Sequence, residues 1–293
     1  MPRGQPVVPD GIAVIDKPPG WTSHDVVAKA RGVLGTRKVG HSGTLDPDAT
    51  GVLVLGVGRA TRLLRFLTAL AKSYEAEIVL GTETDTLDSA GRVTARHEMA
   101  AVTEDQARLA AASLTGDILQ VPPMVSAVKV GGRRLHQLAR EGVEVEREAR
   151  PVTVHRFEVA AVPGYEGVLR AEVDCSSGTY VRVLAADLGR ALGGGAHLRN
   201  LRRVAVGGFG LAEARPVESP EILPMARAVE HLDGVRVAPA VAADVSHGRV
   251  LDLDRLGAVG AGPWAVHDAD GMLLAVYERF RTGAKPSVVV ASV

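Results

Sequence analysis

The spacing of apolar and polar residues predicts short strands mixed with amphipathic helices. Strands are predicted where the two kinds alternate, and helices where apolar residues recur every three or four positions. The predicted strands are 11–16, 74–81, 152–159 and 168–175, and the predicted helices are 24–34, 59–70, 106–114, 179–192 and part of 221–232. No regular strand–helix–strand repeat appears, so we expect an α+β domain built on a large, mixed, mostly antiparallel sheet.

Turn and capping residues place the ends of these elements. Thr22 and Ser23 are good caps for the helix at 24–34, and Thr103 with Gln106 forms a capping box for the next long helix. Three glycines at 193–195 end the helix at 179–192.

A change in pattern near residue 214 predicts a second domain. The segment ARPVESP (214–220) reads as a break, and after Asp233 only short strand-like pieces follow, separated by Gly, Asp and Pro. We therefore expect a first domain at 1–232, in which 1–10 is a flexible tail, and a small β module at 233–293.

Composition indicates an ordinary soluble globular protein. Of the 293 residues 46% are hydrophobic and 23% are charged. The single cysteine, Cys175, excludes an internal disulfide and a cysteine-based metal cluster, and its alternating surroundings predict a buried strand position. The first residues lack a signal-peptide core and no long apolar run follows, so we expect a cytoplasmic protein without a membrane span.

Charge is balanced overall but unevenly distributed. Residues 216–293 carry a net charge of −3, which leaves +3 on residues 1–215. Acid-free basic stretches lie at 31–38, 59–72, 129–140 and 199–203. Such clusters are typical of a phosphate-binding face, although they are equally compatible with solvated helix faces.

Motifs for cofactors and metals are not found in the sequence. There is no GxxxxGK phosphate loop, GVGRAT (56–61) lacks the context of a dinucleotide site, and the nine histidines are scattered. We expect chemistry by side chains alone, with no cofactor and no metal.

The segment GHSGTLDPDATG (40–51) differs from its apolar surroundings. Its glycines permit sharp turns, and Pro47 biases Asp46 away from the helical region. Leu45 beside Asp46 suggests a partly desolvated carboxylate. From the residues alone, a nucleophile or base and a plain turn are both compatible with this loop.

This loop resembles the catalytic motif of the TruB family, the tRNA pseudouridine-55 synthases, in which GTLDP followed by ATG surrounds the catalytic aspartate. The resemblance implies that Asp46 is that aspartate and that Asp48 is not. Ser42 and Asp48 stand where relatives often carry other residues.

Five further segments resemble the family in the right order. They are 16–25, 72–91, 120–142, which resembles an RNA-contacting insertion, 178–189 and 195–209. The likeness covers residues 11–209 well, and the last sixty residues resemble a shortened, acidic PUA domain.

The resemblance implies isomerisation of uridine-55 in the tRNA T arm to pseudouridine, with the base flipped out. Arg182 would pair with Asp46, Tyr74 would stack on the uracil, and Tyr180 and Leu201 would form the pocket wall. His41 and Lys17 would contact RNA or brace the loop. The candidates for phosphate contacts are Arg62, Arg65, Arg133, Arg134, Arg202 and Arg203. The expected partner is tRNA alone, bound by a monomer without a required protein partner.

Two alternatives remain at this stage. One is a synthase that acts on another RNA, like the guide-dependent relatives that use accessory proteins. The other is an RNA-binding or RNA-folding protein that has kept the fold.

Overall fold

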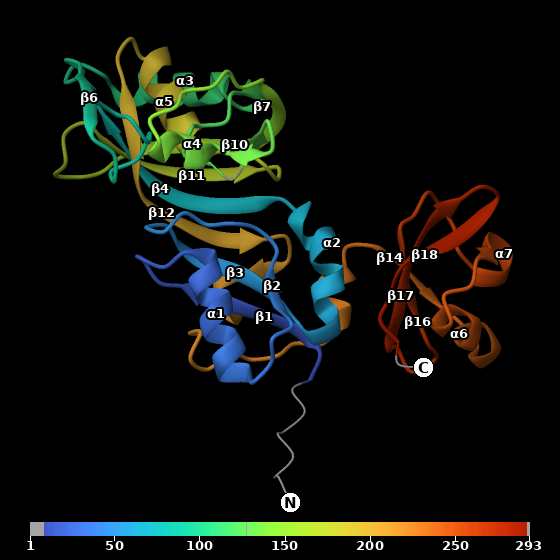
Figure 1. The fold of residues 1–293 in the computed structure, drawn as a ribbon. Coiled ribbons are helices and arrows are strands. Elements are labelled where there is room, and N and C mark those ends of the chain that lie inside the picture. The colour runs from blue at the N-terminus through green and yellow to red at the C-terminus, as the bar shows by residue number, and fades with distance from the viewer. Residues whose placement is uncertain (1–8, 127, 292–293) are drawn as a thin grey trace, which may run out of the picture.

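Two β-sheets, of nine and five strands, organise the chain (Figure 1). The computed structural model describes residues 9–126 and 128–291. The large sheet consists of β1 (Gly11–Lys17), β2 (Val39–His41), β3 (Thr50–Val57), β4 (Lys72–Leu80), β7 (Gly116–Gln120), β10 (Arg150–Ala161), β11 (Val168–Cys175), β12 (Ala196–Val206) and β13 (Phe209–Gly210). The smaller sheet consists of β14 (Asp233–Arg236), β15 (Leu251–Asp252), β16 (Trp264–His267), β17 (Leu273–Phe280) and β18 (Gly283–Val289).

Two hairpins and several helices complete the fold. The hairpins are β5 (Thr82–Thr84) with β6 (Val93–Arg96), and β8 (Lys129–Val130) with β9 (Arg133–Arg134). The α-helices are α1 (Ser23–Leu34), α2 (Leu64–Thr68), α3 (Glu104–Ser113), α4 (Leu135–Arg140), α5 (Val181–Ala191), α6 (Pro239–Ser246) and α7 (Leu253–Leu256). The 3-10 helices are η1 (Gly58–Leu63), η2 (Leu211–Glu213) and η3 (Met225–Val229).

The large sheet is mixed and mostly antiparallel, which confirms the predicted fold class. Its order is β1-β3-β12-β4-β11-β10-β7, and among its described strands only β12 and β3 pair in parallel. At this junction Gly51 has φ +99°, and a Cβ there would lie 2.2 Å from the carbonyl oxygen of Arg203. A glycine is therefore required where the two halves of the sheet meet.

Helices cover the two ends of this sheet. Helix α1 begins after Thr22, whose side chain accepts a hydrogen bond from the Asp25 backbone, as the capping residues predicted. Its buried face, which includes Val26 and Val27, packs on β1 and β3. Helix α5 and helix α3 pack on the strands at the opposite end, where Leu184 is fully buried.

The smaller sheet forms a β half-barrel module with its own core around Trp264 and Tyr277. The expectation of strand-like pieces alone was wrong, because α6 and α7 lie between its strands. The module packs against the rest of the chain beside α2 (Figure 1), in one apolar cluster that includes Leu67, Leu273 and Val276. Its first strand begins at residue 233, and the boundary between 232 and 233 stays a proposal.

Two predicted helices differ in the structure. In place of one helix at 59–70, the chain forms the 3-10 helix η1 and the short α2, which ends at Thr68. The Thr61 hydroxyl donates to the carbonyl of Gly58, three residues back, at 2.7 Å. In 221–232 only η3 forms, since Pro224 precludes a helix that runs through it.

Residues 1–8 of the predicted tail at 1–10 lie outside the described residues. Asp10 is described, and its carboxylate lies 2.5 Å from the side chain of Arg59. The flexible tail stays a prediction.

Candidate active site

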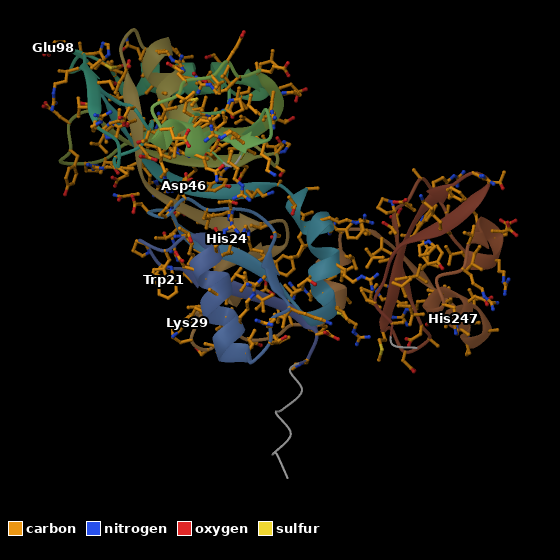
Figure 2. All side chains as sticks on the ribbon, in the orientation of Figure 1. Trp21, His24, Lys29, Asp46, Glu98 and His247 are labelled. Atoms are coloured by element: carbon orange, nitrogen blue, oxygen red, sulfur yellow. The ribbon has the colours of Figure 1, made fainter. Side chains whose placement is uncertain are left out.

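The loop between β2 and β3 brings Asp46 to the middle of the large sheet, between its two covered ends (Figure 2). Asp46 lines a pocket together with side chains from β4, α5 and β12. Tyr74, Tyr180, Arg182 and Leu201 line the same pocket. The structure thus brings together five residues that the resemblance placed at one site.

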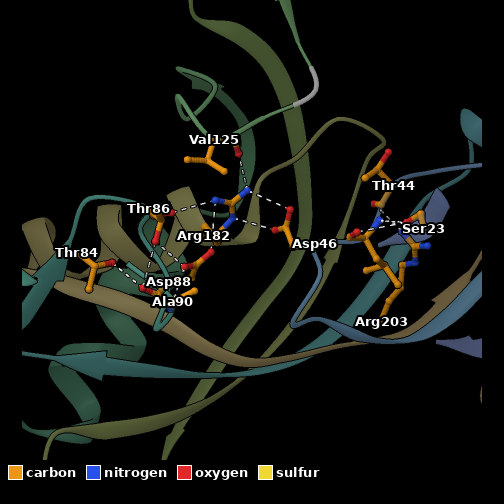
Figure 3. Close-up of polar contacts among 11 residues, drawn as sticks. Ser23, Thr44, Asp46, Thr84, Thr86, Asp88, Ala90, Val125, Arg182 and Arg203 are labelled. Atoms are coloured by element: carbon orange, nitrogen blue, oxygen red, sulfur yellow. Dashed lines mark hydrogen bonds and ion pairs between the residues drawn. The ribbon is translucent and has the colours of Figure 1, made fainter. Parts of the chain in front are cut away.

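Arg182 and Asp46 form an ion pair with two contacts (Figure 3). Nε of Arg182 lies 3.0 Å from Oδ2 of Asp46, and Nη2 lies 3.3 Å from Oδ1. The Arg182 side chain is 4% exposed and also donates to the carbonyls of Thr86 and Val125, each at 2.9 Å. Its orientation is therefore fixed from three directions.

Opposing effects act on the Asp46 carboxyl. Burial raises the pKa of Asp46 and the nearby carboxylate of Asp88 adds to the rise, while Arg182 opposes both. Asp88 itself lies 3.5 Å from Nη1 of Arg182. The Asp46 side chain keeps 40% exposure, so its carboxylate can reach a ligand in the pocket.

Lys17 braces the Asp46 loop from beneath. Its side chain is fully buried, and Nζ donates to the carbonyls of Pro18 at 3.0 Å, Trp21 at 2.6 Å and Pro47 at 2.8 Å. All three N–H groups of the ammonium are thereby used. Lys17 was expected either to contact RNA or to brace the loop. Its burial and its three bonds to carbonyls fit the bracing role.

Arg203 braces the same loop from the other side. It is 2% exposed and donates to the carbonyls of Val52 at 2.7 Å and Gly43 at 3.3 Å. It also donates to the carbonyl of Thr44 at 3.4 Å (Figure 3). The expectation that Arg203 contacts phosphate is wrong, because the strand turns this guanidinium into the interior.

The two tyrosines of the pocket are held differently. Burial raises the pKa of Tyr74, and Arg203, which hydrogen-bonds the Tyr74 side chain, opposes that rise. Tyr180 precedes α5, and its backbone is fixed by the buried Gln120, which accepts from its N–H at 2.9 Å and donates to its carbonyl at 3.3 Å. Gln120 was not singled out from the sequence.

His41 lies beside the loop and is not among the pocket residues. Its Nδ1 accepts a hydrogen bond from the Gly43 backbone at 3.3 Å, and its ring packs edge-on against His24 with centroids 5.4 Å apart. Burial lowers the pKa of His41, and the proximity of His24 adds to this. His41 thus supports the loop through this hydrogen bond and through its packing against His24.

The arginines expected to contact phosphate have protein partners. Arg62 donates to the carbonyl of Val289 in the module at 2.6 Å. Arg202 contacts both carboxylate oxygens of Asp16, at 2.8 and 3.1 Å. Arg133 lies 2.5 Å from Glu141, and both of these side chains are about half exposed. Arg65 and Arg134 are exposed, as are Arg62 and Arg133, so these four charges are open to an approaching polyanion.

Lys72 is a charged pocket residue that the sequence reasoning did not single out. Lys72, at the start of β4, is 6% exposed and donates to the carbonyls of Thr68 at 2.7 Å and Leu70 at 2.6 Å. Burial lowers the pKa of its ammonium to about 8.

Two searches of the described residues gave negative results. No described helix is long and apolar enough to span a membrane. In residues 9–126 and 128–291, no group of three or more His, Cys, Asp or Glu side chains is arranged to hold a metal ion.

Two family models match the chain. The TruB family pseudouridylate synthase (N terminal domain) matches residues 31–181, and the tRNA pseudouridylate synthase B C-terminal domain matches residues 182–236. The chain is 47% identical over 301 residues to tRNA pseudouridine synthase B of Arthrobacter sp. (strain FB24), covering 96% of each. It is 45% identical over 294 residues to the protein of that name from Thermobifida fusca (strain YX), covering 96% of this chain and 99% of that protein.

Solved structures show the same fold. One is an H/ACA RNP bound to a substrate RNA containing 2′-deoxyuridine, with a TM-score of 0.73 and 25% identity over 96% of this chain and 85% of that one. Another is a Cbf5-Nop10-Gar1 complex, with a TM-score of 0.72 and 28% identity over 97% of this chain and 84% of that one. With two family models and full-length relatives in agreement, the chain belongs to the TruB family of tRNA pseudouridine synthases, which are isomerases.

Proposed function

We propose that this enzyme converts uridine-55 in the T loop of tRNA to pseudouridine, with Asp46 as the essential carboxylate. The observation that carries the proposal is the pairing of Asp46 with the buried Arg182 inside a pocket that Tyr74 also lines. The pairing favours the ionised carboxylate and fixes its direction, as a bidentate arginine does. Membership of the TruB family supports the choice of substrate.

The target uridine must leave its stack to enter this pocket. Tyr74 offers an aromatic face to the uracil, and Leu201 adds an apolar wall. Asp46 then either attacks C1′ of the ribose or removes a ribose proton. The C1′–N1 bond breaks, the uracil rotates, and C5 joins C1′ in its place.

We propose that the protein acts on tRNA as a monomer and without an accessory protein. The module at 233–293 would extend the RNA-binding surface, and Arg62, Arg133 and Arg202 would contribute charge near the site. Arg62 and Arg133 are both exposed, whereas Arg202 is about a third exposed and paired with Asp16.

The test is to incubate the purified protein with an unmodified T-arm stem-loop and map pseudouridine by nucleotide position. We expect modification at the position of uridine-55 and at no other uridine. Failure on the stem-loop and on whole tRNA would contradict the proposal.

The structural neighbours include RNA-protein complexes with several components. A guide-dependent reaction would therefore require added RNA and proteins in the same assay. Turnover by the purified chain alone separates the two possibilities. An RNA-folding role is tested separately, by measuring tRNA folding with the Asp46→Asn variant.

A further inference from the structure

Two buried cations line the pocket on the side of Tyr74. The side chains of Lys72 and Arg203 are 6% and 2% exposed. Their hydrogen bonds to the backbone all go to carbonyl groups. Among the described residues, neither side chain has a carboxylate within ion-pairing distance. The third N–H of the Lys72 ammonium has no acceptor in the same set of residues.

The charges of the pocket are therefore unevenly arranged. At one end the positive charge of Arg182 faces the carboxylates of Asp46 and Asp88. At the other end Lys72 and Arg203 bring two positive charges without a counter-charge. Removing a charge from water costs free energy unless an opposite charge compensates it. The arrangement favours a ligand that presents negative charge beside Tyr74.

The proposed reaction supplies such a charge. Uridine enters neutral, and the electron pair of the C1′–N1 bond leaves with the uracil, where it spreads over N1, O2 and O4. In the same step C1′ bonds to the Asp46 carboxylate, or the ribose gives its C2′ proton to that carboxylate. When C5 later bonds to C1′, the C1′–O bond breaks and its electron pair returns to the Asp46 carboxylate, or Asp46 gives its proton back to C2′. C5 then loses its proton to a base and N1 takes one up, which leaves a neutral pseudouridine. One negative charge thus moves from Asp46 to the uracil and back.

A backbone phosphate fits this end of the pocket less well. Phosphates of a bound RNA stay near the surface while the flipped base enters, and Lys72 is almost fully buried. The base is the part of the substrate that reaches Tyr74 and the groups beside it.

We propose that Lys72, with Arg203 beside it, stabilises the uracil anion formed when the glycosidic bond breaks. The inference rests on the proposed function and adds a catalytic residue to it. Because the ligand is charged only after bond cleavage begins, the contribution falls on the rate and not on RNA affinity.

The first experiment measures single-turnover rates with excess enzyme and, separately, the Kd for a T-arm stem-loop. Lys72→Met should slow the saturated rate by about 100-fold, while the Kd changes less than three-fold. Lys29→Met is the matched control, since Lys29 is exposed on α1 (Figure 2) and its loss should leave the rate unchanged.

Lys72→Gln is a second variant, which keeps the test valid if Lys72→Met does not fold. It keeps donors for the carbonyls of Thr68 and Leu70 but lacks the charge, so it should be slowed to a similar degree. Thermal unfolding of both variants verifies that the fold is intact.

The second experiment varies the leaving group. A fluorine at C5 stabilises the uracil anion by itself, so a 5-fluorouridine stem-loop needs the cation less. We expect the wild-type to Lys72→Met ratio of substrate consumption to be several-fold smaller on this RNA than on uridine.

Three results would overturn the inference: an unchanged saturated rate, a raised Kd that accounts for the whole defect, or equal ratios on the two RNAs. A raised Kd would indicate a phosphate contact instead. If wild-type protein modifies neither stem-loop nor tRNA, the proposed function itself has failed; if it does and Lys72→Gln is unimpaired, only this inference has failed.

Discussion

Arg182 and Asp46 lie 136 residues apart in the chain and meet through two contacts of 3.0 and 3.3 Å. The arginine is buried and comes from a helix, whereas the aspartate is partly exposed and comes from a loop. The buried Arg182 thus orients the accessible carboxylate of Asp46. This pairing is the basis of the first three predictions.

Replacing Asp46 with asparagine should reduce turnover roughly 10³-fold or more and change RNA affinity only a few-fold, because the carboxylate performs chemistry and adds little to binding a polyanion. Asp48→Asn is the matched control, since Asp48 is exposed two residues away. It should retain nearly full activity. The opposite ranking, measured by product formation and a binding titration, would show that the loop has been assigned in the wrong register.

Replacing Arg182 with lysine should slow turnover by about 10²-fold although the charge is retained. A lysine cannot keep two contacts to Asp46 while also donating to the carbonyls of Thr86 and Val125. Single-turnover rates decide the point, with unfolding curves as a check on the fold. Activity near that of the wild type would mean that any cation suffices here.

The pH profile of kcat/KM should have an acid limb set by Asp46. Burial raises the pKa of Asp46 above its ordinary value of 3.8, and activity requires the ionised form. Activity should therefore fall as the pH decreases through a midpoint above 3.8, and Asp48→Asn should leave that midpoint in place. A midpoint at or below the ordinary value would contradict the assignment.

Neutralising Arg133 should weaken RNA binding and make it less sensitive to salt. If its exposed guanidinium contacts a phosphate, Arg133→Gln reduces the log–log salt slope by about 1. Arg108→Gln is the control, because Arg108 is equally exposed and also ion-paired, but lies on α3 away from the pocket. Equal slopes for both variants and the wild type would remove Arg133 from the RNA-binding face.

Weakening the apolar contact between the module and the catalytic sheet should lower the free energy of unfolding. Leu67 is fully buried in that cluster, so Leu67→Ala should reduce the free energy of unfolding by about 2–5 kcal/mol. Leu109→Ala, at a site 74% exposed, should change it by less than about 0.5 kcal/mol. Similar unfolding midpoints for the two variants would contradict a stabilising contribution from this apolar contact. For the same reason, deleting residues 233–293 would expose this cluster.

The sequence by itself determined the local features of this protein. Thr22 and Thr103 began their helices as predicted, because a cap acts within one turn of its own residue. The alternating strands appeared where their spacing placed them, and the motif around Asp46 identified the family before any contact was known. Each of these signals lies within about ten consecutive residues.

The tertiary structure decided which charges face water and which support the site. Lys17, Lys72 and Arg203 look like ordinary surface cations in the sequence, yet all three are buried. Nearly all of their acceptors are backbone carbonyls, half of these in other segments, and such carbonyls leave no trace in residue types. The side chain of a long-range partner can be guessed from a motif, as Arg182 was; a carbonyl partner exists only once the chain has folded.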